Sequence, residues 1–239
     1  MNIALIGYGK MGVEIEQIAT KRGHTITQRF IDVDPVTLER LRGNDCCIDF
    51  STASAIQFNV TSSLSLGIPI VIGTTGWNNE MNDVRALVDQ YNGALVYGSN
   101  FSLGANIFFK LAEDASKIFN TYTDYDVAVH ETHHNMKKDA PSGTALTVAN
   151  KVLQHFLRKQ KISTLPTNIK PDELLVSSSR IGSVVGEHTV RFNSLADDII
   201  LTHNAHNRSG FALGAVLAAE WIVSKKGFFT FEELLWSSQ

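Results

Sequence analysis

The chain has 239 residues, of which 44% are hydrophobic and 19% charged, a composition typical of a globular protein of one or two domains. Its formal net charge is −3; without a basic excess to neutralise phosphates, we expect no nucleic-acid partner. Two adjacent cysteines cannot build a disulfide framework, the N-terminus lacks a signal-peptide pattern, and no apolar run approaches the ~20 residues of a membrane span. We therefore expect a cytoplasmic protein without a membrane partner.

Strands and helices alternate over the first hundred residues. Strand candidates lie at residues 2–6, 25–31, 46–50, 69–72 and 94–97. Helical spacing predicts helices at residues 11–22, 53–66 and 79–90. Strands that alternate with helices build a parallel sheet with helices on both faces. The sequence therefore predicts an α/β fold with a Rossmann-type, doubly wound parallel sheet.

The pattern changes after about residue 101. Helices are predicted at 104–119, after a capping Ser142, at 211–224 and at 231–236. Strands are predicted at 125–131, 174–179, 188–193 and 198–203, with polar connections at 133–141 and 160–173. We expect a first domain at residues 1–102 and a smaller α+β domain, with a mixed or antiparallel sheet, at residues 103–208. The pattern alone does not assign the terminal helices to either domain.

A glycine-rich turn follows the first strand and consists of Gly7, Tyr8, Gly9, Lys10, Met11 and Gly12. Glycines let the backbone approach a pyrophosphate, and the start of the next helix offers N–H groups to that anion. Asp32 follows Gly12 by 20 positions, where a carboxylate can bind the ribose hydroxyls of an adenosine. We therefore predict that NADH and/or NADPH binds here. Asp32 would repel a 2′-phosphate and favours NADH, whereas the nearby Arg29 leaves NADPH open.

Two later segments also follow predicted strands: Gly73, Thr74 and Thr75, and then Gly98, Ser99, Asn100 and Phe101. Ligands of open α/β sheets bind beyond the carboxyl ends of the strands. We expect these residues to line the nicotinamide pocket, with ordinary connecting loops as the alternative.

The segment 129–144 carries most of the reactive side chains. Histidines can exchange protons near neutral pH, and lysines supply a cation or a proton. Ser142, Gly143 and Thr144 offer N–H and hydroxyl groups at a helix start, where a substrate carboxylate would bind. A solvated polar turn is one alternative. A metal site is another, because His130, His133 and His134 are clustered, but the HExxH spacing is absent and we expect no metal.

The run from residue 131 to 145, ETHHNMKKDAPSGTA, resembles the signature of the 4-hydroxy-tetrahydrodipicolinate reductase family, also called dihydrodipicolinate reductases. Segments similar to the same family occur in family order at residues 7–12, 49–51, 73–76, 100–102, 186–189 and 208–214. The first turn is one residue shorter than the family pattern G-x-x-G-x-M-G. The resemblance covers essentially the whole chain.

The resemblance implies an NAD(P)H-dependent oxidoreductase of lysine biosynthesis via diaminopimelate, acting on a small cyclic imine with two carboxylates. It implies that His133 is the acid/base residue, that Lys137 is a proton donor, and that His134, Gly143 and Thr144 hold the substrate. It also implies that residues 209–239 return to the first domain and that the second domain builds a homotetramer. The implied cofactor contacts are Gly7 to Gly12, Asp32, Phe50, Ser51, Gly73 to Thr75 and Gly98 to Phe101.

Two other functions fit the same residues. One is a different NAD(P)-dependent dehydrogenase of amino or imino acids on the same architecture. The other is a non-catalytic dinucleotide sensor, which would bind the cofactor without turnover and leave the histidine–lysine segment without a purpose.

Overall fold

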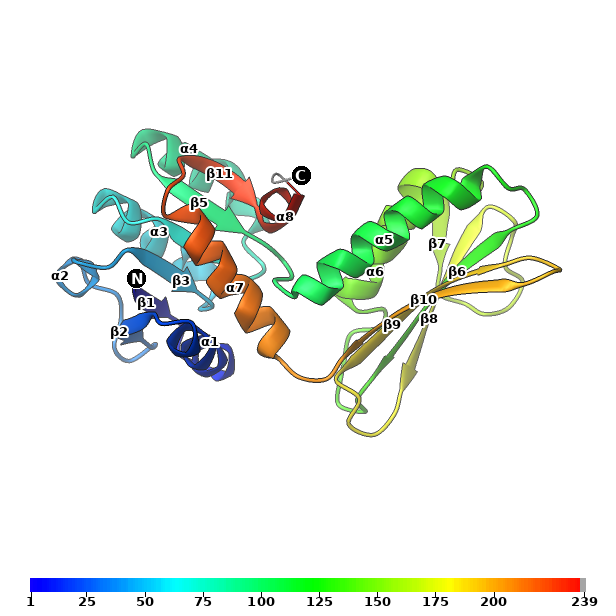
Figure 1. Cartoon of the computed structure of the whole chain (residues 1–239), viewed down its shortest axis with the longest axis horizontal. Coiled ribbons are helices and arrows are strands. Elements are labelled where there is room, and N and C mark those ends of the chain that lie inside the picture. Colours follow the sequence, from blue (N-terminus) through cyan, green and yellow to red (C-terminus); the bar gives the residue numbers. More distant parts are fainter. Residues whose placement is uncertain (237–239) are drawn as a thin grey trace. The chain divides into compact units, whose positions relative to one another are not determined.

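A computed structural model describes residues 1–236 of the chain and divides into two compact units (Figure 1). Unit 1 contains residues 1–103 together with the described residues from 208 onward, and unit 2 contains residues 104–207. Within residues 1–236, no helix combines the length and the apolar character needed to cross a membrane.

Unit 1 is built on a six-stranded sheet whose paired strands all run parallel. Its strands are β1 (Asn2–Ile6), β2 (Thr25–Phe30), β3 (Cys46–Asp49), β4 (Ile70–Ile72), β5 (Ala94–Tyr97) and β11 (Gly227–Thr230). Their spatial order is β11-β5-β4-β3-β1-β2. The chain moves outward from β1 to β2 and then returns to the other side of β1, so the order reverses between β1 and β3. The predicted Rossmann-type parallel sheet is confirmed.

Helices cover both faces of this sheet. Successive side chains of a strand point to opposite faces, so apolar strands present an apolar surface on each side that helices must cover. Ile3 and Leu5 of β1 pack on one side, while Ala4 and Ile6 pack on the other. The first side is covered by α1 (Lys10–Lys21), α7 (Ser209–Ile222) and α8 (Phe231–Trp236). The second is covered by α2 (Leu38–Leu41), α3 (Ile56–Ser65) and α4 (Met81–Gln90), with 3₁₀ turns at Ala53–Ala55 and Asn78–Glu80.

Two short strands were not predicted. β11 adds the sixth strand of unit 1 beside β5, and its four residues are too few to show a period. β7 (Lys161–Ser163) pairs with β8 inside the stretch that we predicted to be a surface connection, so that prediction was wrong for three residues. Both lie at sheet edges, where pairing with a neighbour forms a strand that its own sequence does not announce.

Unit 2 contains a five-stranded mixed sheet in the order β10-β9-β6-β8-β7. Its other strands are β6 (Asp126–His133), β8 (Glu173–Arg180), β9 (Gly186–Asn193) and β10 (Asp198–Ala205). β6 runs parallel to β8 and antiparallel to β9, which confirms the predicted second sheet.

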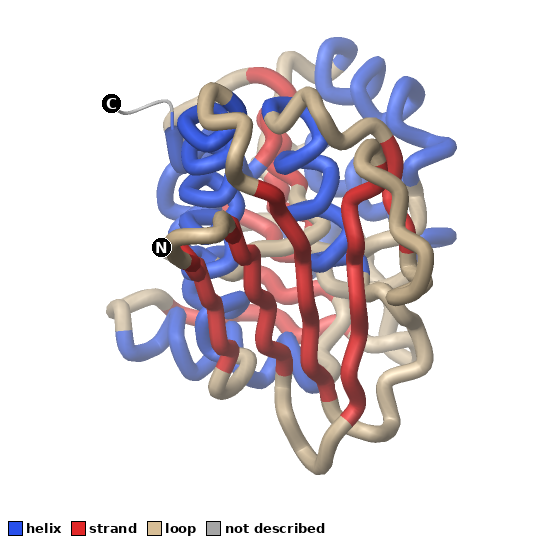
Figure 2. Tube along the Cα trace, turned by 90° about the vertical axis from the view of Figure 1, so that its right-hand side faces the viewer, coloured by secondary structure: helices blue, strands red, loops and turns tan. Residues whose placement is uncertain are grey.

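The helices α5 (Leu103–Asn120) and α6 (Gly143–His155) cover one face of this second sheet. Phe108 of α5 and Val148 of α6 join the same core as Val129 of β6 and Phe192 of β9. Figure 2 shows the sheet from its other face, over which no helix of unit 2 lies. Alternation along β6 therefore separates a covered face from an open one.

Candidate functional site

The cofactor segments predicted in unit 1 all begin where a strand ends, at the carboxyl edge of the sheet. A cavity of about 230 Å³ opens at the point where the strand order reverses. Gly7, Asp32 and Ser51, which follow β1, β2 and β3, line it together with Phe30 and Asn59. This is the position at which open α/β sheets bind their ligands.

The glycine turn has the shape that a dinucleotide needs. Gly7 has a φ of +84°, and a Cβ there would lie 2.4 Å from the carbonyl oxygen of Phe50. A Cβ on Gly9 would meet nothing within 4 Å, and no side chain caps the helix that starts after it. The turn therefore packs tightly on its inner side and presents bare backbone and free helix N–H groups outward, where a pyrophosphate can bind.

Asp32 is exposed and lies two positions beyond the end of β2, which stops at Phe30, one residue before the predicted end of the strand. Arg29, which could have offset its charge, donates from Nε to the Glu16 carboxylate at 2.8 Å. Its guanidinium also lies over the ring of Tyr8, 5.6 Å from the ring centroid. The hydrogen bond from Arg29 lowers the pKa of Glu16 to about 2, so the two charges neutralise each other.

A second cavity, of about 300 Å³, lies beyond β4 and β5. Thr74, Thr75, Gly98 and Ser99 are among its lining residues. Phe101, in contrast, is 2% exposed and packs in the core of unit 1. The structure therefore brings most of the predicted nicotinamide segment to a hollow and places Phe101 behind it.

Asp49 was missed as a site residue, although it stands at the end of an otherwise apolar strand. Its buried carboxylate accepts hydrogen bonds from Ser51 Oγ at 2.7 Å and from Thr74 Oγ1 and Asn59 Nδ2, both at 2.8 Å. It thereby ties the loop after β3 to the loop after β4. Next to it, a Cβ on Gly73 would lie 2.1 Å from the Phe50 ring, so only glycine lets these loops approach.

In unit 2, strand β6 positions the reactive side chains. It continues to His133 rather than ending at residue 131 as predicted, because Thr132 and His133 still pair with β9 and β8. Glu131 and His133 therefore lie on the helix-covered face with Val129, while His130 lies on the open face and bonds Ser177 Oγ at 2.8 Å. The three histidines of the metal hypothesis do not converge.

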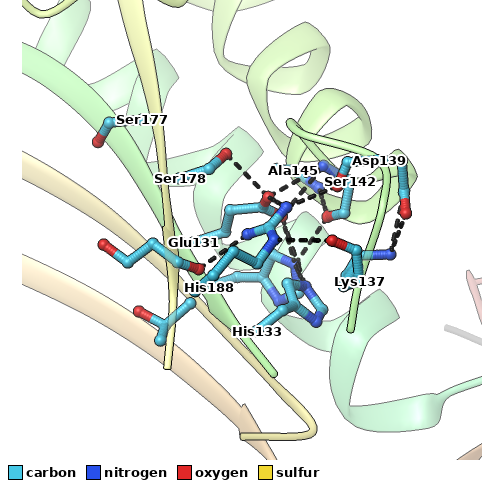
Figure 3. Close-up of polar contacts among 12 residues, drawn as sticks. Glu131, His133, Lys137, Asp139, Ser142, Ala145, Ser177, Ser178 and His188 are labelled. Atoms are coloured by element: carbon cyan, nitrogen blue, oxygen red, sulfur yellow. Dashed lines mark hydrogen bonds and ion pairs between the residues drawn. The ribbon is translucent and has the colours of Figure 1, made fainter. Parts of the chain in front are cut away.

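His133 is 7% exposed, and both of its ring nitrogens have partners. Nδ1 lies 3.0 Å from the carbonyl oxygen of Val185; a carbonyl only accepts, so Nδ1 carries the proton. Nε2 faces Glu131 Oε2 and His188 Nε2, each at 3.4 Å (Figure 3). Burial lowers the pKa of His133 more than Glu131 raises it, and the net shift is downward.

His188, which sequence reasoning did not select, completes this cluster from β9. Its Nε2 is 3.2 Å from Ser142 Oγ, and its buried Nδ1 has no hydrogen-bond partner in the described structure. Burial lowers the pKa of His188 to about 4. Glu131, His133 and His188 are close enough to share a metal ion. We interpret them instead as a proton-handling cluster, because both Glu131 oxygens already accept from protein donors.

The segment after β6 is tied to Glu131 through Arg180, a further residue that sequence reasoning missed. Arg180 donates to Glu131 Oε1 at 3.1 Å and to the carbonyl oxygen of Asp139 at 2.6 Å. Lys137 forms an ion pair with Asp139 at 2.8 Å. In Figure 3, Glu131 of β6, Ser178 of β8 and His188 of β9 lie close to the loop that carries Lys137 and Asp139.

The start of α6 adds the remaining predicted substrate residues. Ser142 caps the helix, since its Oγ accepts from Ala145 N at 3.1 Å, and its own N–H donates to Glu131. The hydroxyl group and the N–H group of Ser142 therefore both form hydrogen bonds inside unit 2. Gly143 is exposed, whereas Thr144 and His134 are half-buried.

Two domain models of one protein family match this chain, one after the other. The N-terminal domain model of dihydrodipicolinate reductase matches residues 1–101, and the C-terminal domain model matches residues 104–235. The 4-hydroxy-tetrahydrodipicolinate reductase of Christiangramia forsetii is 40% identical over 237 residues, covering 98% of both chains. The enzyme of the same name from Archaeoglobus fulgidus is 38% identical over 239 residues, covering 97% of this chain and 83% of its own.

Solved structures share the fold. The dipicolinate-bound dihydrodipicolinate reductase from Paenisporosarcina sp. TG-14 aligns with a TM-score of 0.81 at 20% identity, over 98% of this chain and 99% of its own. The amine dehydrogenase from Mycobacterium smegmatis aligns with a TM-score of 0.57 at 9% identity, over 97% of this chain and 95% of its own. The matches of both family domains and the two relatives confirm the resemblance found in the sequence: the chain belongs to the 4-hydroxy-tetrahydrodipicolinate (dihydrodipicolinate) reductase family, whose members are oxidoreductases with a nicotinamide cofactor.

Proposed function

We propose that the protein reduces 4-hydroxy-tetrahydrodipicolinate to tetrahydrodipicolinate with NAD(P)H, in the diaminopimelate route to lysine. The observation that carries the proposal is the arrangement around β6, where a buried Glu131–His133–His188 cluster adjoins the Lys137 segment and the start of α6. A sensor that only binds a dinucleotide has no use for this cluster. The family membership adds support from the whole length of the chain.

The substrate is a ring with two carboxylates, and unit 2 offers the groups that would bind them. We assign this role to His134, Gly143 and Thr144, with Ser142 supporting them as the cap of α6. The exposed start of α6 provides N–H groups and the positive end of a helix dipole. Lys137 forms an ion pair with the carboxylate of Asp139, and a substrate carboxylate can replace that of Asp139.

The nicotinamide ring, when bound, supplies a hydride to the substrate ring, whose hydroxyl group is lost as water, and the protein must supply a proton to the carbanion that the hydride leaves in that ring. We assign that proton to Lys137, because both ring nitrogens of His133 already have partners inside unit 2. His133 holds one proton at Nδ1 against Val185 and takes up or releases a second at Nε2, facing Glu131. A positioned proton donor such as Lys137 contributes about 10²–10⁴-fold in rate.

The assay that tests the function follows NADH and NADPH absorbance with the product of the preceding aldolase-type synthase as substrate. We expect oxidation of the cofactor that depends on this substrate. A panel of 2-oxo acids and simple imino acids serves as the control and should be turned over slowly. If neither cofactor is oxidised, or if a panel compound is the better substrate, the assignment is wrong.

We further propose that NADH is the preferred cofactor. Asp32 lines the cavity beyond β2, where its carboxylate accepts from ribose hydroxyls and repels a 2′-phosphate. Arg29 cannot offset this charge while it is paired with Glu16. Asp32→Ala should reduce kcat/KM for NADH by about tenfold or more, as expected for loss of hydrogen bonds to a charged group, and should reduce it much less for NADPH. Glu39→Ala, which removes an exposed acid of α2 outside the cavity, is the control.

Two further proposals concern the oligomeric state and the location of the enzyme in the cell. We propose that the open face of the second sheet joins copies of the chain into a homotetramer, and that the enzyme works in the cytoplasm. The buried, unpaired Cys46 and Cys47 suit a reducing compartment.

A further inference from the structure

We propose that Glu131 is a positioning residue that holds both His133 and the segment carrying Lys137. The proposal rests on the reductase function given above. The Glu131 side chain has no exposed surface, so it acts through its neighbours rather than by contact with the substrate.

Glu131 is kept as a carboxylate inside unit 2. Burial raises the pKa of its carboxyl group, but hydrogen bonds from Ser142, Ser178 and Arg180 outweigh that effect and hold the pKa below its usual value. Ser178 Oγ donates at 2.9 Å, and the Ser142 N–H lies 3.1 Å from each oxygen. A buried charge is costly, and neutral replacements of buried ion pairs are often as stable. Stability of the fold therefore does not explain why a charge stands here.

The first function of this charge concerns His133. Because Nδ1 is already protonated against Val185, a second proton can enter only at Nε2, 3.4 Å from Glu131 Oε2. The carboxylate stabilises the imidazolium that results. The ring packs against the start of β9, where a Cβ on Gly186 would lie 2.8 Å from its Cε1, so a glycine at this position leaves room for the imidazole. Val185 thus leaves Nε2 as the atom at which His133 exchanges its proton, and Glu131 stabilises the proton at that atom.

Other groups near His133 act against the carboxylate. Burial and the positive charges of Lys137 and Arg180 lower the pKa of His133, while Glu131 raises it. His188 approaches from β9 and stays neutral near pH 7, because burial lowers its pKa to about 4. The groups facing His133 are Glu131 on β6, Arg180 on β8, His188 on β9, and Lys137 and Asp139 in the loop. Among them, Glu131 is the buried negative charge.

The second function of the charge concerns Lys137. Arg180 binds Glu131 Oε1 and, from the same guanidinium, the carbonyl oxygens of Asp139 at 2.6 Å and Lys137 at 3.4 Å. Arginine presents its donors in a rigid fork, so the carboxylate that orients the fork also orients the loop. One buried carboxylate therefore places the acid/base histidine and the lysine relative to each other.

The first test measures His133 directly and needs no turnover. In EDTA-treated protein with ¹⁵N-labelled histidine, long-range NMR spectra report the tautomer and pKa of each ring, and the spectrum of His133→Gln identifies His133. We expect the Nδ1–H tautomer in the wild type and a lower His133 pKa in Glu131→Gln, because the imidazolium loses its carboxylate. Glu187→Gln makes the same chemical change at a neighbouring position whose side chain alternates to the other face of β9, and should leave the His133 pKa unchanged.

The second test is kinetic. Glu131→Gln should lower kcat about 10²-fold, the cost of a misplaced catalytic group, and leave KM for NADH unchanged because the cofactor segments belong to unit 1. Arg180→Lys keeps a positive charge beside Glu131 but loses the fork. It should lower kcat while the His133 pKa stays near its wild-type value.

An unchanged His133 pKa in Glu131→Gln would overturn the link to His133, and an unchanged kcat in Arg180→Lys would overturn the link to Lys137. If Glu131→Gln does not fold, Arg180→Lys still tests the link to Lys137, and an Nε2–H tautomer of His133 in the wild type would overturn the link to His133. If the wild type itself fails to oxidise NADH or NADPH, the reductase function is wrong, while the NMR titration still tests the positioning of His133.

Discussion

Lys137→Ala is expected to lower kcat by about 10²–10⁴-fold, the usual contribution of a positioned proton donor, while the dissociation constant of NADH stays unchanged. The lysine belongs to unit 2, whereas the turn of Gly7 and the cavity beside Asp32 belong to unit 1. The substitution should therefore lower turnover without changing cofactor binding. Stopped-flow absorbance for the chemical step and NADH fluorescence for binding make the two measurements.

Two matched variants sharpen this result. Lys137→Arg keeps the positive charge but cannot release a proton at neutral pH, so it should restore KM for the substrate without restoring kcat. Lys138→Ala removes an exposed lysine next in the chain and should behave as wild type. A variant Lys137→Ala that binds NADH poorly but turns over normally would show that the lysine has been assigned to the wrong role.

Gly7→Ala is expected to abolish NADH binding and to destabilise unit 1. A Cβ at this position would lie 2.4 Å from Phe50 O and 2.6 Å from Ser51 N, both backbone atoms. A positive φ alone costs a non-glycine residue about 1–2 kcal/mol. The clash adds to that cost, so we expect a loss of more than about 3 kcal/mol and a displaced loop at Ser51. Thermal unfolding and NADH fluorescence measure the two effects.

Gly23→Ala is the matched control, because Gly23 has a φ of +83° and a Cβ there would meet nothing within 4 Å. It reports the conformational cost without the clash, and NADH binding should survive. If Gly7→Ala binds NADH as tightly as Gly23→Ala does, the glycine turn is not the pyrophosphate site.

The sequence predicted the parallel sheet because strand candidates alternate with helical spacing, and three of the strands, β1, β4 and β5, are apolar runs followed by a glycine. The same reasoning placed Gly7, Asp32, Thr74 and Ser99 at one edge of the sheet. The end of a strand can be recognised in the sequence without knowing how the side chains pack. Phe101 was assigned to that edge by the same rule, but its ring is large and apolar and belongs to the core.

The proton-handling cluster could be predicted only in part. Alternation along β6 places Glu131 and His133 on one face, and that signal was available in the sequence. His188 and Arg180 come from β9 and β8, 55 and 49 positions away from the residues that they contact. Their approach depends on the register between strands, which no local pattern reveals.

The division of the chain also governs the order in which the protein can form during synthesis. Unit 2 is one continuous stretch, residues 104–207, and all of its core is available once that stretch has left the ribosome. Unit 1 waits longer: Ile3, Leu5 and Val96 lie in the same core as Ala215 and Val216 of α7. Until residues beyond 208 emerge, that face of the nascent sheet is covered only in part, by α1. Unit 2 can therefore fold first, and the dinucleotide-binding unit is completed only when the segment from residue 208 onward has emerged.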